Sequence, residues 1–173
     1  DLVANGIDVA LRLGKLADSS LGARTLGVNP WVLVASPSYL KKRGTPRKPS
    51  DLKEHATLIY SSVQGNDLWR LRNPSGEPVS IPVTGRLRSN NLSALLAAAR
   101  LHMGIASLPR YVAHDSLKDG RVVEVLKTCR LPEQEIHAVY PSPRLVPQKV
   151  QSFIAFLQGK FDDAWWEDLP RGG

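Results

Sequence analysis

Asn90 and Asn91 are residues whose type and position could bind a ligand. They stand between an alternating segment that ends at Ser89 and an apolar, helix-forming segment that begins at Leu92. Short polar side chains of this kind cap helix starts, and the exposed N–H groups of a first helical turn attract anions. The position therefore predicts a site for a small anion or carboxylate. The alternative is that the two asparagines only cap the helix.

The surrounding residues 85–109 predict a parallel strand–helix–strand crossover. Residues 83–89 alternate as in a strand with one covered face. The helix that follows is expected to bury one apolar stripe, formed by Leu92, Leu95, Leu96, Ala99 and Met103. Gly104 is expected to end this helix in a left-handed turn, and residues 105–108 read as a short buried strand. Open α/β folds bind ligands at the carboxyl ends of their strands, so the asparagines should lie at such an edge.

Catalytic and metal-binding patterns are missing from the sequence. The four histidines share no ligand spacing, and the sequence has no H-E-x-x-H, G-x-S-x-G or P-loop pattern. The single Cys129 excludes an internal disulfide and any multi-cysteine metal site, and it fits a reducing compartment. We therefore expect no enzyme activity, no metal and no cofactor.

Composition indicates a globular chain with a positive charge. The 173 residues are 42% hydrophobic and 23% charged, with a net charge of +7 that permits attraction to nucleic acid. The one dense basic run, Lys41-Lys42-Arg43, is interpreted as a solvated rim rather than a phosphate-binding patch. No run approaches the roughly 20 apolar residues of a membrane span, and the start does not resemble a signal peptide. A cytoplasmic fragment of a longer protein is expected.

Strands and helices alternate through most of the chain, which predicts the α/β class. The most apolar segments, Trp31–Ala35 and Ile136–Tyr140, are expected to be buried on both faces. Strands are also expected at 8–13, 23–28, 56–60 and 122–126, a hairpin turn at 73–76, and helices at 37–43, from 50, at 111–117 and from 147. Residues 2–7 are expected to be the end of a helix, and Ser50 is expected to cap a short helix. The last helix is expected to bury one face, formed by Val150, Phe153, Ile154, Leu157 and Phe161.

The positions of the two apolar strands predict that the chain folds into two lobes. The first lobe is predicted to consist of residues 1–36 and 138–164, and the second of residues 37–137. Residues 165–173 form a tail, in which Trp165 and Trp166 either cover an edge or are disordered. Clefts between lobes are favoured ligand sites.

Four segments, in order and spacing, resemble one protein family. DLVANGIDVALRLG resembles D-L-V-x-x-G-x-D-V-A-[IL]-R-x-G, and WVLVASPSYLKKRGTPRKPSDLKEH resembles V-A-S-P-x-Y-L…G-x-P-x-x-P-x-D-L-x-x-H. GRLRSNNLSALLAAARLHMGIASLPRYVA resembles G-x-[LF]-x-x-N…A-x-x-x-G-x-G-[IV]-A-x-L-P, with His102 and Met103 in place of the usual small residues. IHAVYPS and PQKVQSFIAFL are similar to the last strand and helix. The family is that of the LysR-type transcriptional regulators.

This resemblance implies an effector-binding domain with a two-lobed type II periplasmic-binding-protein-like fold and an incomplete first lobe. Such domains bind a small inducer, often an organic anion, between their lobes. They assemble as homodimers or tetramers and signal to an N-terminal winged helix-turn-helix. That module and the opening strand–helix–strand of the first lobe are expected to lie outside this sequence, so DNA would be a partner only through the missing module, and no membrane partner is expected.

The resemblance also implies a set of effector-binding residues, which lie at predicted strand ends and turns. They are Arg12, Leu13, Ser36, Pro37, Ser61, Ser62, Asn90, Asn91, Gly104, Ile105, Ala106 and Ser107. Each has a plainer interpretation: Gly104 as a helix stop, the serines as turn residues, Arg12 as a surface cation. Two further functions stay open, a solute-binding protein of the same fold and a non-specific nucleic-acid-binding fragment.

Overall fold

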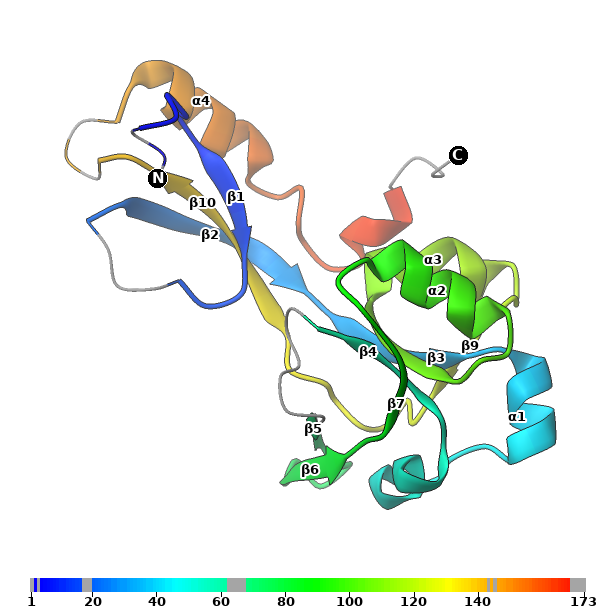
Figure 1. The fold of residues 1–173 in the computed structure, drawn as a ribbon. Helices are drawn as coiled ribbons and strands as arrows, with labels where there is room; N and C mark the ends of the chain where they lie inside the picture. Colours follow the sequence, from blue (N-terminus) through cyan, green and yellow to red (C-terminus); the bar gives the residue numbers. More distant parts are fainter. Residues whose placement is uncertain are drawn as a thin grey trace. The chain divides into compact units, whose positions relative to one another are not determined.

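The computed structural model describes residues 2, 4–16, 20–61, 68–142, 144 and 146–168 (Figure 1). The chain divides into two compact units. The first unit combines Asp1–Asn29 with Glu133–Leu169, and the second unit contains Pro30–Pro132. The fold class is α/β, as predicted. The lobe boundaries expected from the sequence stay a prediction.

The first unit is built on an antiparallel sheet. Among the described residues its strand order is β1-β10-β2, with β1 at Ala10–Leu13, β2 at Gly22–Asn29 and β10 at Gln134–Tyr140. Helix α4 (Gln148–Leu157) packs on it, and the short helix η3 (Trp165–Asp168) follows. Its core consists of Leu26, Ile136, Ala138, Val150 and Ile154. The predicted apolar strand Ile136–Tyr140 is therefore part of β10 and belongs to this unit.

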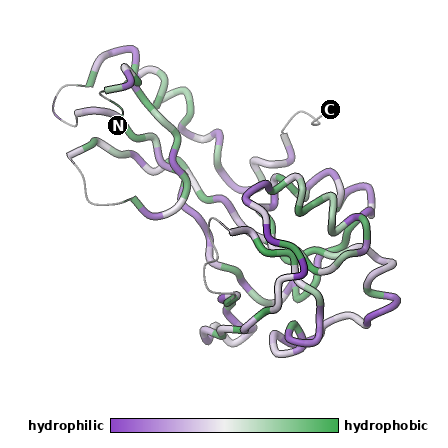
Figure 2. The backbone as a smooth tube through the Cα atoms, in the orientation of Figure 1, coloured by the Kyte–Doolittle hydropathy of each residue, from purple (hydrophilic) through white to green (hydrophobic). Residues whose placement is uncertain are grey.

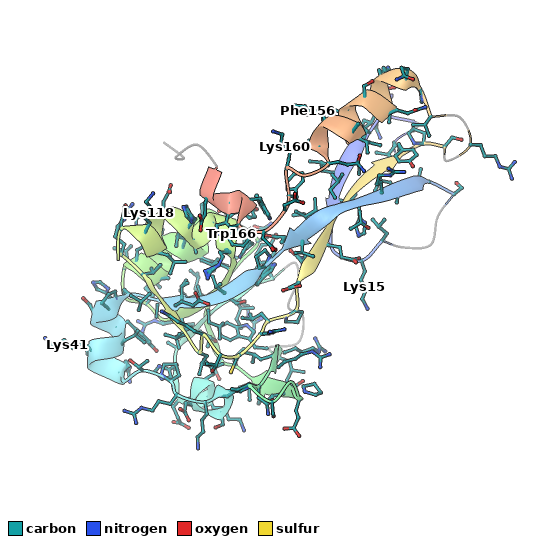
Figure 3. All side chains as sticks on the ribbon, turned by 180° about the vertical axis from the view of Figure 1, so that it is seen from behind. Lys15, Lys41, Lys118, Phe156, Lys160 and Trp166 are labelled. Atoms are coloured by element: carbon teal, nitrogen blue, oxygen red, sulfur yellow. The ribbon has the colours of Figure 1, made fainter. Side chains whose placement is uncertain are left out.

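The described residues between Leu2 and Ile7 form a turn in which the Ile7 N–H donates to the Leu2 carbonyl and Gly6 has a φ angle of +63°. This is the hydrogen-bond pattern that closes helices, with glycine in the left-handed position, as expected for Asn5-Gly6. One expectation for the first unit was wrong in detail. Phe153 is 44% exposed, since it sits at the margin of the α4 stripe, beyond the reach of the sheet. Phe156 is also exposed, and the Lys160 ammonium lies 5.4 Å from its ring centroid (Figure 3).

Trp165 covers the edge strand β2. Its indole N–H donates a hydrogen bond of 2.9 Å to the Val28 carbonyl, and its ring meets Phe161 edge-on at 5.3 Å. Of the two alternatives for this aromatic pair, the covering role is confirmed for Trp165. Residues 169–173 of the predicted tail lie outside the described residues.

The second unit is built on a mixed sheet with the strand order β7-β4-β8-β3-β9. The bounds are β3 Trp31–Ala35, β4 Thr57–Tyr60, β7 Gly85–Ser89, β8 Ile105–Pro109 and β9 Val123–Val125. Strands β7 and β8 both pair in parallel with β4, whereas β3 runs antiparallel to β8 and β9. The predicted β7–α2–β8 crossover is confirmed, with β4 inserted between its two strands.

Helices and a hairpin cover the two faces of this sheet (Figure 1). Helices α2 (Leu92–Arg100) and α3 (Arg110–Lys118) bury Leu95, Ala98, Ala99 and Ala113 against one face. The other face is covered by α1 (Pro37–Arg43), η1 (Pro49–Glu54) and the hairpin of β5 (Leu68–Arg72) and β6 (Pro78–Pro82). Figure 2 shows hydrophobic residues along the central strands and hydrophilic residues around α1. All five residues of β3 are buried, as expected.

Two turn expectations in the second unit were wrong. Ser50 does not cap η1; the Asp51 carboxylate accepts hydrogen bonds from the N–H groups of Arg47 and Lys48 instead. Helix α2 ends at Arg100, and the left-handed residue of its closing turn is His102, not Gly104. Gly104 serves a different need. A Cβ there would lie 2.4 Å from the Ala56 carbonyl oxygen, so the close approach of the two backbones requires glycine.

Candidate functional site

Three parallel strands of the second unit end along one edge of the sheet, called here the carboxyl edge. The register pairs Tyr60 at the end of β4 with Ser89 at the end of β7. Trp31, the first residue of the antiparallel strand β3, pairs with Pro109 at the end of β8. These strand ends, and the turn from β7 into α2, are the part of the unit where an open α/β sheet places its ligands.

The start of α2 is arranged by hydrogen bonds at this edge. The Asn91 side-chain oxygen accepts from the Ala94 N–H at 3.0 Å, which confirms its predicted capping role. The Asn91 N–H donates to the Ser89 hydroxyl at 3.0 Å, and the Ser61 N–H donates to the Ser89 carbonyl at 3.1 Å. A first helical turn has four N–H groups without intrahelical acceptors. Since the N–H groups of Asn91 and Ala94 are engaged, those of Leu92 and Ser93 remain for solvent or an anion.

An aromatic group stands beside this helix start. Tyr60 and Trp31 lie with their ring centroids 5.9 Å apart, in a tilted arrangement. The pKa of the Tyr111 phenol is raised by burial and, to a smaller extent, by the neighbouring Tyr60. Aromatic rings and exposed backbone N–H groups suit a ligand that combines an apolar ring with a negative group.

The predicted site residues fall into separate places. Ser61, Asn90 and Asn91 gather at the carboxyl edge, where Asn90 is exposed. Ser36, Pro37 and Gly104 lie at the opposite edge, called here the amino edge, because β3 runs against β8. A small ligand cannot contact both edges, since five strand residues span about 16 Å.

The remaining predicted residues do not join either group. Ile105, Ala106 and Ser107 are buried inside β8, with at most 1% of their surface exposed. Arg12 and Leu13 are exposed on β1 in the first unit. Ser62 lies outside the described residues. The effector-binding role of all twelve residues stays a prediction.

Sequence reasoning missed three contributors to the carboxyl edge, namely Trp31, Tyr60 and Ser89. Tyr60 directly precedes the predicted Ser61, so its place at a strand end could have identified it. Trp31 could not be identified in this way, because it begins a strand and only the antiparallel direction of β3 brings it to this edge.

Two cavities lie elsewhere, one in each unit. In the second unit a cavity of about 580 Å³ opens at the amino edge, and Pro37 and His102 are among its lining residues. In the first unit a groove of about 540 Å³ follows α4, and three glutamines, Arg24 and Tyr140 are among its lining residues. Each is large enough for a small metabolite.

The buried titratable groups of the second unit have structural partners. The Tyr39 hydroxyl and the His55 Nδ1 atom lie 3.1 Å apart, and burial lowers the pKa of His55 and raises that of Tyr39. Burial also raises the pKa of the Cys129 thiol. Within the described ranges, no three His, Cys, Asp or Glu side chains gather as a metal site would require. No helix in that part of the chain could cross a membrane.

Comparison with known proteins assigns the chain to a family. The family model described as LysR substrate binding domain matches residues 1–162. The chain belongs to this family. The LysR substrate-binding domain is 35% identical over 150 residues to an uncharacterized HTH-type transcriptional regulator of Haemophilus influenzae, an alignment that covers 87% of this chain and 52% of the relative. It is 34% identical over 161 residues to the HTH-type transcriptional activator AaeR of Escherichia coli, covering 93% and 52% of the two chains.

Solved structures support the same assignment. The full-length structure of AphB, a virulence activator of Vibrio cholerae, matches with a TM-score of 0.78 and 32% identity, over 92% of this chain and 54% of that one. The predicted family and the periplasmic-binding-protein-like fold are therefore confirmed. The LysR substrate-binding domain spans about half the length of the curated relatives it matches, which are transcriptional regulators.

Proposed function

We propose that this chain senses a small organic anion and thereby controls a transcription factor of the LysR type. The observation that carries the proposal is the family match over residues 1–162, combined with relatives that are HTH-type transcriptional regulators. In this proposal the effector binds at the carboxyl edge of the second unit, and its binding changes the activity of a winged helix-turn-helix elsewhere in the parent protein.

The chemistry of the carboxyl edge supports an anionic effector. The N–H groups of Leu92 and Ser93 lack intrahelical acceptors, and the positive end of the helix dipole favours negative charge there. The Trp31–Tyr60 pair offers apolar surface for the body of the ligand. An aromatic or short aliphatic carboxylate fits both features.

The partners in this proposal are a small-molecule inducer and further copies of the same protein. The parent protein works in the cytoplasm as a dimer or tetramer and contacts DNA through its helix-turn-helix module. A sensing role is favoured over a catalytic one because the named relatives are transcriptional regulators.

A ligand screen tests the proposal. The thermal midpoint of the chain is measured with a panel of aliphatic and aromatic carboxylates and with the amide of each acid. A ligand at a hundred times its Kd adds about 2.7 kcal/mol to the free energy of unfolding, which for a chain of this size raises the midpoint by roughly 5–10 °C. Carboxylates should produce the shift, and the uncharged amides should not.

A pair of matched variants locates the ligand. Ser61→Trp fills space beside the start of α2 and should abolish the shift. Ser80→Trp places the same bulk on an exposed residue of β6, away from the carboxyl edge, and should leave the shift intact. A shift that survives Ser61→Trp, or a panel in which no carboxylate acts, would contradict the proposed site and the proposed ligand class respectively.

A further inference from the structure

The C-terminal end of α2 borders a cavity that the proposed effector site does not use. This is the cavity of about 580 Å³ at the amino edge. Its lining residues come from α1, from the end of α2 and from the turn after α3: Pro37, Ser38, Ala97, Arg100, Leu101, His102, Gly120 and Arg121. Ligand pockets commonly have about this volume. The cavity lies entirely in the second unit.

Positive charge prevails in this cavity. Arg121 forms an ion pair of 2.6 Å with Asp119, which offsets its charge. The Arg100 guanidinium makes no hydrogen bond or ion pair with any residue in the described part of the chain. Its guanidinium is therefore available to a ligand, and a planar guanidinium binds carboxylates through two parallel hydrogen bonds. The rest of the lining is largely apolar, with Ala97, Leu101 and Pro37.

His102 stands where the backbone favours glycine. Its φ angle is +62°, in the left-handed region. The Met103 N–H bonds to the Ala98 carbonyl and the His102 N–H bonds to the Ala99 carbonyl, which is the closing turn that usually takes glycine. A histidine in this conformation costs about 1 kcal/mol relative to glycine. Side chains kept at such positions are often functional.

A buried hydroxyl fixes the orientation of the His102 ring. Ser36, which is 1% exposed, places its Oγ atom 2.7 Å from the His102 Nδ1 atom. The same Oγ accepts a hydrogen bond from the Tyr39 N–H at 3.3 Å, so the cap of α1 holds the hydroxyl in place. With Nδ1 engaged, Nε2 is the ring nitrogen left to meet a ligand in the cavity.

We propose that this cavity is a second ligand site, which binds a small carboxylate with a short apolar body through Arg100 and His102. It is separate from the carboxyl edge. The nine residues of α2 lie between the two places and span about 13 Å, more than a ligand of this size can bridge. The site is therefore distinct from that of the effector proposed above.

Histidine resonances give a direct test. The chain, labelled with ¹⁵N in its histidines, is titrated with benzoate at constant ionic strength, and benzamide serves as the uncharged probe of the same shape. The ring signals of His102 should move along a saturating curve with benzoate and stay still with benzamide. The signals of His55 and His137, which are buried against other partners, should not follow that curve.

Variants assign the binding to named side chains. Arg100→Gln should weaken benzoate binding at least tenfold, and loss of the imidazole in His102→Gly should also weaken it, as followed by calorimetry. Lys53→Gln removes one exposed positive charge that does not line the cavity and should leave the affinity unchanged. Ser61→Trp should also leave it unchanged, because that substitution blocks only the carboxyl edge.

Three outcomes would overturn the second site. The first is a shift of His102 that grows linearly with benzoate and never saturates. The second is an equal loss of affinity in Arg100→Gln and Lys53→Gln, which would reflect general charge attraction. The third is loss of the saturating component in Ser61→Trp, which would place the ligand at the carboxyl edge. Thermal midpoints of the variants establish that each is folded.

Discussion

The two ends of helix α2 follow different rules. At its start, Asn91 caps the helix through the hydrogen bond that its side-chain type predicts. At its end, the left-handed position that glycine would fill is held by His102. Helix capping alone explains the presence of Asn91. At the other end, the left-handed backbone of His102 costs stability, while its side chain is directed to a cavity. Residues that violate a local rule without a net gain in stability are candidates for binding, and at His102 the Ser36 hydrogen bond only offsets the backbone cost.

The largest loss of stability is expected from a substitution at Leu95, whose burial fixes α2, and with it both helix ends, on the sheet. Leu95 lies in the middle of α2 with 0% of its surface exposed. Leu95→Ala should lower the free energy of unfolding by about 2–5 kcal/mol, because it leaves a cavity against the sheet. Urea unfolding measures this. Leu101→Ala, at a side chain 72% exposed, is the matched control and should change stability by less than about 0.5 kcal/mol.

If Leu95→Ala cost no more than its control, α2 would not be fixed on the sheet. Its two ends would then lack defined positions, and the comparison between them would lose its meaning.

The next effect concerns the turn after α2. Gly104→Ala should cost about 1–3 kcal/mol, because the new methyl group would meet the Ala56 carbonyl oxygen and push β8 from its neighbour. Urea unfolding again provides the measurement. An unchanged stability would mean that the backbones at Gly104 and Ala56 can move apart without cost, and that glycine is not required at 104.

A smaller effect is expected at the start of α2. Asn91→Ala removes the side-chain cap of the Ala94 N–H and should cost about 1 kcal/mol. Asn90→Ala changes the same atoms one residue earlier, where the side chain is exposed, and should cost less than about 0.5 kcal/mol. Equal losses in chemical unfolding of the two variants would show that Asn91 is not the residue that caps α2.

The smallest effect is expected at the end of α2. His102→Gly should change stability by no more than about 1 kcal/mol, because relief of the left-handed strain offsets loss of the Ser36 hydrogen bond. His102→Ala should be less stable than His102→Gly, since alanine keeps the strain and also loses the bond. The order of the unfolding midpoints measures this. An alanine variant as stable as the glycine variant would remove the contrast between the helix ends.

Local sequence patterns predicted the elements of the second unit because their determinants are local. The continuous apolar run of β3, the Pro37 start and Gly44 end of α1, and the Asn91 cap each depend on residues a few positions apart. The left-handed turn after α2 was predicted at Gly104, because glycine usually occupies this position. In this chain His102 occupies it instead, so the general rule gave the wrong residue.

The candidate site was predicted less completely, because strand direction is not a local property. Ser36 and Ser61 both follow apolar strands and look alike in the sequence. Since β3 is antiparallel to β8 while β4 is parallel to it, the two serines lie at opposite edges. Only the long-range pairing of the strands separates them, and that pairing also brings Trp31 to the edge where Ser61 lies.

The two border strands of the sheet in the second unit affect how readily the sheet could pair with another chain. The sheet of the second unit terminates in β7 on one side and in the three-residue β9 on the other. Arg86 and Arg88 are exposed on β7. A short border strand offers few backbone groups to a foreign chain, and a charged one repels a copy of itself. Among the described residues, both border strands therefore carry a feature that natural sheets use against edge-to-edge self-assembly.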